Sequence, residues 1–422
     1  MAKPTSHGDP DRPEPSTDAG YEPPEPRAAL LDAAIALLAE RGTYGASLRE
    51  IAKRAGVNYG LVHYYFATKH DLLREALSRA VSQRQAATSS RGEWGPRIIE
   101  HPPSDTTVRA VFHLALDWDN YGEVFAGSPV VSRRLERLRE LYGDQADDVR
   151  LRAAYAASFC LQMAWLVLAP QQLAAVNASP EHEGEIAEFI KEVVRAILPL
   201  ALRPAPNRAM RERVDPAPKR AAGTTNPPDA RDALLDAGIV LLAERGTHGV
   251  SSRAVAKRAG VNYGLVYYYF ATKSELLSQA LRLELSRYLE GSATNEAWQA
   301  SLIDRPPADT TWRSFVHLAL DWDSYGDAFE SFSHIADARM RQLRAMYADV
   351  DELRLRAAYI ASVCLQIGWL VLAPQQLAAA NASAEDGAAF RDFITEVDEA
   401  ILDVARLDSP PSAPGGERRL GS

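Results

Sequence analysis

Residues Ala52–Val62 read AKRAGVNYGLV, and residues Ala256–Val266, 204 positions later, read the same eleven letters. Around this stretch, Tyr44–Lys69 and His248–Lys273 are identical at 20 of 26 positions without a gap. The same offset relates two later pairs of identical strings, LALDWD and WLVLAPQQLAA. A repeat of this length has the size of a whole domain and is far longer than the roughly 20–50 residues of a solenoid repeat. The sequence therefore predicts two copies of one folded unit in a single chain.

Each copy opens with a pattern of short helices. Apolar residues spaced three and four apart predict an amphipathic helix that ends near Gly42. Ser47 and Glu50 form an S-x-x-E capping box that begins a second helix, which stops at Gly56. Asn58 is a good N-cap for a third, short helix, and a fourth follows directly. Downstream segments predict further helices, at Thr106–Trp118, Val130–Tyr142, Val149–Ala175 and Glu183–Leu202.

No stretch alternates apolar and polar residues with a period of two, so we predict an all-α protein built from two tandem units. Each unit consists of a helix-turn-helix head and a helical body. The last two helices of each body are apolar enough to form a four-helix interface with the other copy. The predicted segments are a disordered tail (1–26), a first head (27–80) and body (81–203), a linker (204–229), a second head (230–284) and body (285–407), and a tail (408–422).

The composition is that of an ordinary globular protein, with 46% apolar and 24% charged residues in a chain of 422. Cys160 and Cys364 occupy equivalent positions in apolar runs, which predicts buried free thiols in a reducing cytosol. No signal peptide is evident. The longest apolar run, Ala153–Ala169, is shorter than the ~20 residues of a membrane span. We therefore expect a cytoplasmic protein that does not contact a membrane.

The net charge of -9 argues against DNA binding only if it is spread evenly. It is not spread evenly, because Arg41–Lys69 holds five basic residues and one acidic residue. Arg245–Lys273 holds five basic residues and no acidic residue. Two local basic patches of this kind are typical of DNA-binding heads.

A helix, a glycine turn and a short helix with a basic flank form a helix-turn-helix, in which the second helix enters the major groove. The pattern AxxAGVNxGxxxxYFxxKxxLL, after a helix that ends in ERG, resembles the TetR family of bacterial regulators over Arg27–Leu77 and Arg231–Leu281. The resemblance implies DNA-binding heads, ligand-binding bodies and a homodimeric assembly. Two such units in one chain imply an intrachain pseudo-dimer, and further pairing of two chains stays open.

By resemblance, the recognition helices are Asn58–Phe66 and Asn262–Phe270. Tyr59 and Leu61 are expected to face the groove, where leucine offers only apolar contact with a thymine methyl group. For Tyr64 a core position is an equal alternative, and for Lys53 a solvated face. The second unit lacks the capping box, because Ala254 replaces Glu50. The residues assigned to DNA are Arg49, Lys53, Asn58, Tyr59, Gly60, Leu61, His63, Tyr64 and Lys69, with Arg253, Lys257, Asn262, Tyr263, Gly264, Leu265, Tyr267, Tyr268 and Lys273 in the second unit.

The body contains aromatic and polar residues that suit a mostly apolar small-molecule pocket. Plain core packing is the alternative for each aromatic side chain. His113 and Asp117 share a helix face, as metal ligands do, but no third ligand is evident, so we expect neither a metal nor a cofactor. The predicted ligand-binding residues are His113, Asp117, Trp118, Tyr121, Gln162 and Trp165, with His317, Asp321, Trp322, Tyr325, Gln366 and Trp369 in the second unit; Phe125 and Tyr155 accompany them.

The sequence thus predicts a DNA-binding repressor that acts on a near-palindromic operator and is relieved by an apolar or amphipathic effector. An enzyme is not expected, since the chain has no glycine-rich phosphate loop, no nucleophile elbow and no metal cluster. The alternatives are a helical scaffold protein and a small-molecule-binding protein that does not bind an operator.

Overall fold

The computed structural model describes residues 25–88, 98–99, 105–126, 128–179, 181–204, 229–291, 302–305, 309–329, 332–383 and 385–407. The two predicted tails and the predicted linker lie outside these residues, apart from residues 25–26, 204 and 229. Within the described ranges the regular structure is helical and includes no strand, which confirms the all-α prediction.

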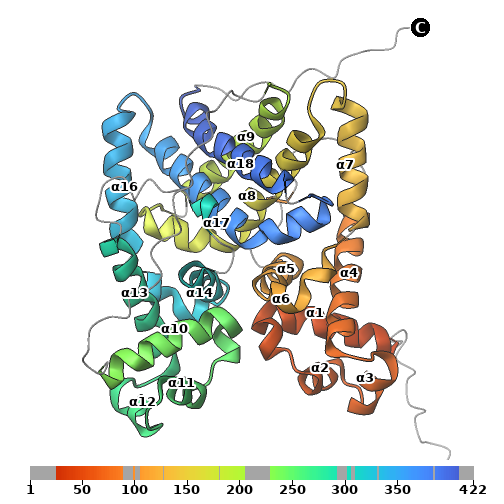
Figure 1. The fold of residues 1–422 in the computed structure, drawn as a ribbon, viewed down its shortest axis with the longest axis vertical. Helices are drawn as coiled ribbons and strands as arrows, with labels where there is room; N and C mark the ends of the chain where they lie inside the picture. The colour runs from red at the N-terminus through yellow and green to blue at the C-terminus, as the bar shows by residue number, and fades with distance from the viewer. Residues whose placement is uncertain are drawn as a thin grey trace, which may run out of the picture.

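Each head is a compact group of three helices, followed by a helix that leads into the body (Figure 1). Leu30, Leu38 and Val62 are fully buried, so the apolar spacing read from the sequence does form the core of the first head. The first unit contributes α1 (Pro26–Gly45), α2 (Leu48–Ala55), α3 (Tyr59–Tyr65) and α4 (Lys69–Thr88), and the second contributes α10 (Ala230–Gly249), α11 (Ser252–Ala259), α12 (Gly264–Tyr269) and α13 (Lys273–Gly291).

The bodies repeat one another in the same way. The first comprises α5 (Thr106–Leu116), α6 (Trp118–Tyr121), the short 3-10 helix η1 (Gly122–Val124), α7 (Pro129–Tyr142), α8 (Asp148–Ala175) and α9 (His182–Ala201). The second comprises η3 (Leu302–Asp304), α14 (Thr310–Ala319), α15 (Trp322–Tyr325), η4 (Gly326–Phe329), α16 (Phe332–Met346), α17 (Glu352–Ala379) and α18 (Asp386–Ala405). The prediction of one helix over Thr106–Trp118 is wrong at its end, because the helix breaks at Asp117.

The helices α8 and α17 are the cores of their bodies. Both have 28 residues and are long and apolar enough to cross a membrane, but 89% and 72% of their most apolar windows are buried inside the protein. Packing on all sides explains a helix that is apolar all round. Cys160 and Cys364 lie in these helices, where burial raises the pKa of both thiols.

The two bodies pack against each other through α8, α9, α17 and α18, which lie across the middle of the molecule (Figure 1). The contacts come in reciprocal pairs. Arg150 forms a two-pronged ion pair with Glu396, with both N–O distances at 3.0 Å. Arg354 pairs with Glu192 at 2.9 Å. Because each pair maps onto the other at the offset of 204 residues, the two units are related by a pseudo-two-fold axis.

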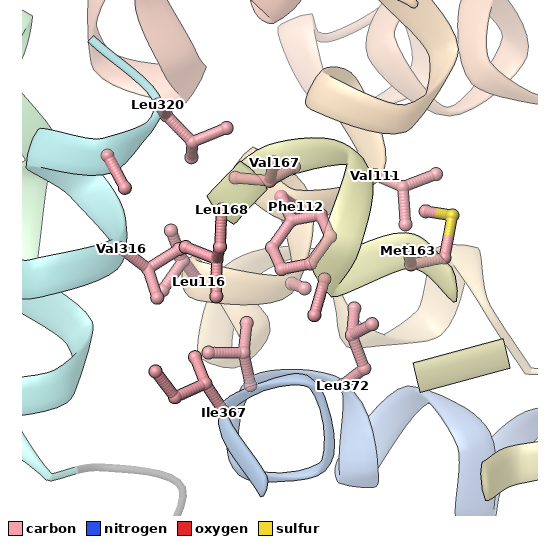
Figure 2. Packing of buried hydrophobic residues seen from close by; sticks show 14 of the residues in the cluster. Val111, Phe112, Leu116, Met163, Val167, Leu168, Val316, Leu320, Ile367 and Leu372 are labelled. Atoms are coloured by element: carbon pink, nitrogen blue, oxygen red, sulfur yellow. The ribbon is translucent and has the colours of Figure 1, made fainter. Parts of the chain in front are cut away.

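Apolar residues from both units form one continuous core beside this interface. Figure 2 shows Phe112 and Leu116 from the first unit packed near Val316 and Leu320 from the second, with Ile367 of α17 below them. The arginines of α5 and α14 add a second reciprocal pair, in which Arg109 donates to the carbonyl of Leu320 and Arg313 donates to the carbonyl of Leu116. The two units therefore share one continuous core.

The two heads lie at the same end of the molecule, and their first helices touch (Figure 1). A side chain added at Gly45 would meet the Cβ of His248 at 3.0 Å, and one added at Gly249 would meet the Cβ of Tyr44 at 2.7 Å. Glycine at these positions permits the close approach of α1 and α10, which sets the separation of the heads.

Candidate nucleic-acid interface

Three local features fix the ends of α2 and the start of α3. Ser47 Oγ accepts the backbone N–H of Glu50 at 3.2 Å and begins α2. Gly56 ends α2 in the left-handed region, at φ 68° and ψ 24°. Asn58 Oδ1 accepts the N–H of Gly60 at 2.8 Å and begins α3. These contacts fix the angle between the two helices, as a helix-turn-helix requires.

The second head repeats this turn. Ser251 Oγ accepts the N–H of Ala254 at 3.2 Å, so the cap survives without the glutamate of the first unit. Gly260 adopts φ 70° and ψ 24°, and Asn262 Oδ1 accepts the N–H of Gly264 at 2.8 Å. The two turns therefore have the same geometry.

Burial separates the core face of α3 from its outer face. Val62 and Phe66 are buried, whereas Tyr59 is 40% exposed and Tyr64 is 78% exposed. Leu61 is half-buried. The open question about Tyr64 is settled in favour of an outward side chain, and Tyr268 of the second unit is also 78% exposed.

Cations and aromatic rings alternate on the outer face. The guanidinium carbon of Arg49 lies 5.7 Å from the centre of the Tyr59 ring, and that of Arg253 lies 5.5 Å from the Tyr263 ring. Such a contact orients an exposed arginine without neutralising it. Lys53 and Lys257 are exposed beside them. We call Arg49, Lys53, Tyr59, His63 and Tyr64, with their counterparts Arg253, Lys257, Tyr263, Tyr267 and Tyr268, the head surfaces.

The two head surfaces differ at one residue of the recognition helix. In the first, the rings of Tyr59 and His63 meet edge to face at 5.1 Å between centroids. In the second, the hydroxyls of Tyr263 and Tyr267 share a hydrogen bond of 2.7 Å. The polar groups offered to a ligand therefore differ between the heads at this point.

Neighbouring cations have structural partners. Arg54 forms a two-pronged pair with Glu40, at 2.5 and 2.6 Å, and Arg258 pairs with Glu244 at 3.1 Å. The hydrogen bond and charge of Arg54 lower the pKa of Glu40. These pairs fasten α2 to α1 and α11 to α10, so they position the head surfaces.

Lys69 and Lys273 lie apart from the head surfaces. The ammonium group of Lys69 donates to the carbonyl of Thr43, and that of Lys273 donates to the carbonyl of Thr247 at 2.9 Å. Burial lowers the pKa of both lysines, while the carboxylates of Asp117 and Asp321 oppose this effect. The phosphate contacts predicted for these lysines stay a prediction, since an ammonium group that donates to one carbonyl keeps two further N–H donors.

The predicted ligand residues His113 and His317 meet each other at the interface between the units, with ring centroids 6.3 Å apart. Burial lowers the pKa of His113 well below its usual range and that of His317 to about 3, so both rings are neutral. Asp117 accepts from the hydroxyl of Thr43 at 2.7 Å, and Asp321 lies 4.0 Å from His248. Among the described residues no group of three His, Cys, Asp or Glu side chains is placed to bind a metal ion.

The other predicted ligand residues are mostly engaged within the protein. Gln162 bonds to the hydroxyl of Ser158 at 3.0 Å and accepts the N–H of Ile98 at 3.0 Å. Gln366 bonds in the same way to Ser362 and Leu302. The remaining residues stack or pack: Trp165 and Trp369 are buried, Trp118 stacks on Phe125, Tyr121 stacks on His70, Tyr325 is buried, and Trp322 packs on Phe329.

A cavity of about 650 Å³ does lie in the first body, but it is lined by a different set of residues. It opens between α4, α5, α7, α8 and α17, and of the aromatic residues considered from the sequence only Phe125 and Tyr155 line it. Sequence reasoning missed Val108, Val111 and Arg133 of its wall. One signal was available in the sequence, because Val108 and Val111 are much smaller than their counterparts Trp312 and Phe315. Trp322 instead lines a separate, open hollow with Ala174 and Asn177.

Comparisons with known proteins agree with the head geometry. Residues 30–76 and 234–280 both match the family model described as bacterial regulatory proteins, tetR family. The chain is similar to an HTH-type transcriptional repressor of Mycobacterium tuberculosis, with 30% identity over 187 residues that cover 44% of this chain and 96% of that protein. It is also similar to the HTH-type transcriptional regulator BetI of Burkholderia ambifaria, with 35% identity over 170 residues, or 40% of this chain and 71% of BetI.

Proposed function

This chain belongs to the TetR family of bacterial regulatory proteins and carries two family units in tandem, and from that premise we propose that it is a repressor whose two heads bind one near-palindromic DNA operator. The chain is a DNA-binding transcriptional regulator, and we place its action in the cytoplasm, where the DNA lies. The observation that carries the proposal is that two nearly identical head surfaces lie at the same end of a pseudo-two-fold molecule (Figure 1).

The side chains of the head surfaces, together with Leu61, have two proposed roles. Arg49 and Lys53 are exposed cations beside α3, which suits them to phosphate oxygens that fix the head on the duplex. Tyr59 and Leu61 lie near the start of α3, the part of a recognition helix that reaches base edges. Tyr59 has a hydroxyl to donate, whereas Leu61 offers apolar contact with a thymine methyl group.

The position of α4 supports the proposal that an effector relieves repression. This helix lines the body cavity with Leu77 and Val81, and its first residue, Lys69, is bonded to the end of α1 in the head. An effector that fits better when α4 has moved would therefore shift the head away from its DNA-binding position. The first cavity and the first head are thus joined by one rigid element.

Footprinting on the DNA upstream of the protein's own gene tests operator binding, and variants test the roles. Tyr59→Ala with Tyr263→Ala is expected to abolish the preference for the footprinted site over random DNA. Lys53→Ala with Lys257→Ala is expected to weaken binding to every sequence and to reduce the slope of log K against log salt by about 2. The control variant is Arg137→Ala, which removes an exposed cation of α7 that is distant in sequence from the heads. Unchanged DNA binding in both double variants contradicts the proposal.

A further inference from the structure

The cavity of the first body has an apolar interior. Its walls include Val108 and Val111 of α5, Met163 of α8 and Leu372 of α17. A volume of about 650 Å³ lies in the range that holds a drug-sized ligand. Apolar walls of this kind favour an aromatic or branched aliphatic body in the ligand.

The second unit supplies polar atoms to this cavity. Gln375 and Gln376 of α17 line it and are 1% and 5% exposed. Neither amide atom of Gln375, nor Oε1 of Gln376, has a hydrogen-bond partner among the described residues. Buried amides are almost always hydrogen-bonded in folded proteins, so these atoms point to a polar group of a ligand or to water in the cavity.

The rim of the cavity is basic. Arg133 and Arg134 of α7 line it and are exposed, and Arg134 opposes the rise that burial causes in the pKa of Tyr155. Arg74 and Arg84 also line it, where they pair with Asp71 and Asp105. The acids of the wall are Glu75, which pairs with Arg27, and Glu123. The surplus of positive charge at the rim favours an anionic group on the ligand.

The second body differs at the same places. Val108 and Val111 are replaced by Trp312 and Phe315, which are 8% and 1% exposed. The rings of Trp312 and Phe315 lie 5.6 Å apart between centroids, and Phe315 meets Phe329 at 5.1 Å. Larger, buried aromatic rings thus stand where the first body has valines. At the offset of 204 residues Arg133 corresponds to Asp337 and Arg134 to Ala338, so an acid and an apolar residue replace the two rim arginines at these positions.

We propose that each chain binds one effector, an amphipathic anion, in the cavity of the first body, and that aromatic side chains close the second body to it. The regulatory meaning of this single site rests on the proposed function. A homodimer must carry two identical sites, whereas two linked units are free to diverge. The one effector contacts α4 of the first unit and α17 of the second, so it acts on both halves of the interface.

Titration with 1-anilinonaphthalene-8-sulfonate, a fluorescent amphipathic monoanion, tests the stoichiometry on the full chain. We expect one probe per chain. Val108→Trp with Val111→Phe, which copies the second body into the first, is expected to abolish binding. The reverse exchange, Trp312→Val with Phe315→Val, is expected to raise the count to two, and it keeps the test decisive if the first variant fails to fold.

The anion requirement has its own test. N-phenyl-1-naphthylamine has nearly the same ring body without the sulfonate. Arg133→Gln with Arg134→Gln is expected to weaken the anionic probe by about tenfold and to leave the neutral one unchanged. An equal effect on both probes overturns the assignment of the rim to an anion.

The proposal is overturned if the wild-type chain binds two probe molecules or none. It is also overturned if the Val108→Trp, Val111→Phe variant still binds one probe molecule, or if the Trp312→Val, Phe315→Val variant binds only one. Operator binding, measured separately by gel shift, distinguishes this result from failure of the proposed function. One probe per chain without operator binding supports the site and contradicts the function. Operator binding with two probes per chain supports the function and contradicts the single site.

Discussion

Asp398 is a half-buried carboxyl group of α18 in the second body, at the position where the first body has Val194. It accepts hydrogen bonds from the hydroxyl of Ser362 at 2.6 Å and from the amide of Gln366 at 3.0 Å. Burial raises the pKa of Asp398 from 3.8 to about 6, although these two hydrogen bonds oppose the shift. The folded protein therefore holds this proton at a pH where the unfolded chain has lost it.

We expect the free energy of unfolding of the protein to depend on pH through Asp398. Because the folded-state pKa is raised, the contribution of Asp398 is fully present below pH ~4 and is lost as the pH rises towards 6. Asp398→Val removes this dependence. We expect the difference in unfolding free energy between wild type and variant to shift by about 2–3 kcal/mol in favour of the variant between pH 4 and pH 7. Urea denaturation at both pH values measures it, and a difference that does not change with pH contradicts the assignment.

The junction between α1 and α5 shows how two elements are fixed by one backbone position. Gly42 has φ 69° and ψ -176°, inside the span of α1, and Gly246 repeats this in α10. A side chain at Gly42 would meet Nδ1 of His113 at 2.9 Å. The bend of α1 thus brings the head against the body helix that reaches the interface between the units.

Gly56 is a control for the positive φ alone, since it has φ 68° and ψ 24° and nothing lies within 4 Å of an added side chain. We expect Gly56→Ala to cost about 1 kcal/mol, the usual penalty of the left-handed region. Gly42→Ala should cost about 2 kcal/mol or more, because its backbone region is nearly exclusive to glycine and the methyl group overlaps His113. Thermal and urea unfolding of both variants measures the difference. Equal costs would show that the contact with His113 does not restrain α1.

The helices of the heads were predictable because their signals are local. Ser47, Gly56 and Asn58 act within a few residues of their own position, and each takes the role that the sequence indicates. The capping box predicted for the first unit is only half formed, because the N–H of Ser47 donates to the carbonyl of Gly45 and the Glu50 carboxylate lies 3.9 Å from Arg41. The absence of this glutamate from the second unit therefore has little structural consequence. Ser251 keeps its hydrogen bond, because that bond goes to a backbone N–H and does not involve the residue at position 254 through its side chain.

Contacts between residues far apart in the sequence determine the structural features that the sequence did not predict. The helix predicted over Thr106–Trp118 breaks at Asp117, whose carboxylate accepts from Thr43 of the head and from Asn120. Pro170 lies inside α8, as it does in the helix predicted over Val149–Ala175. Packing of α8 on all sides outweighs the backbone hydrogen bond that the proline removes. The cavity depends on α7 and on α17 of the other unit, which no periodicity places together.

At the scale of the whole molecule, the pseudo-two-fold axis replaces the symmetry of a homodimer. At the crossing of α8 and α17, a side chain on Gly368 would meet the carbonyl oxygen of Cys160 at 2.4 Å. The equivalent residue of the first unit is Ala164. The interface thus contains one glycine and one alanine where a symmetric dimer would have two identical residues. The two halves have therefore diverged at the crossing of α8 and α17.

The covalent link should make assembly independent of concentration. Residues 205–228 join the units, and a tether of this length holds them at an effective concentration in the millimolar range. We expect the Tm and the operator affinity of the intact chain to stay constant on dilution. With a protease site inserted in 205–228, the uncut protein should behave in the same way. After cleavage, both quantities should fall on dilution, because the halves then separate by mass action. A cleaved protein that stays insensitive to dilution would show that the interface of α8, α9, α17 and α18 alone holds the units together. An intact chain that responds to dilution would show that two chains associate.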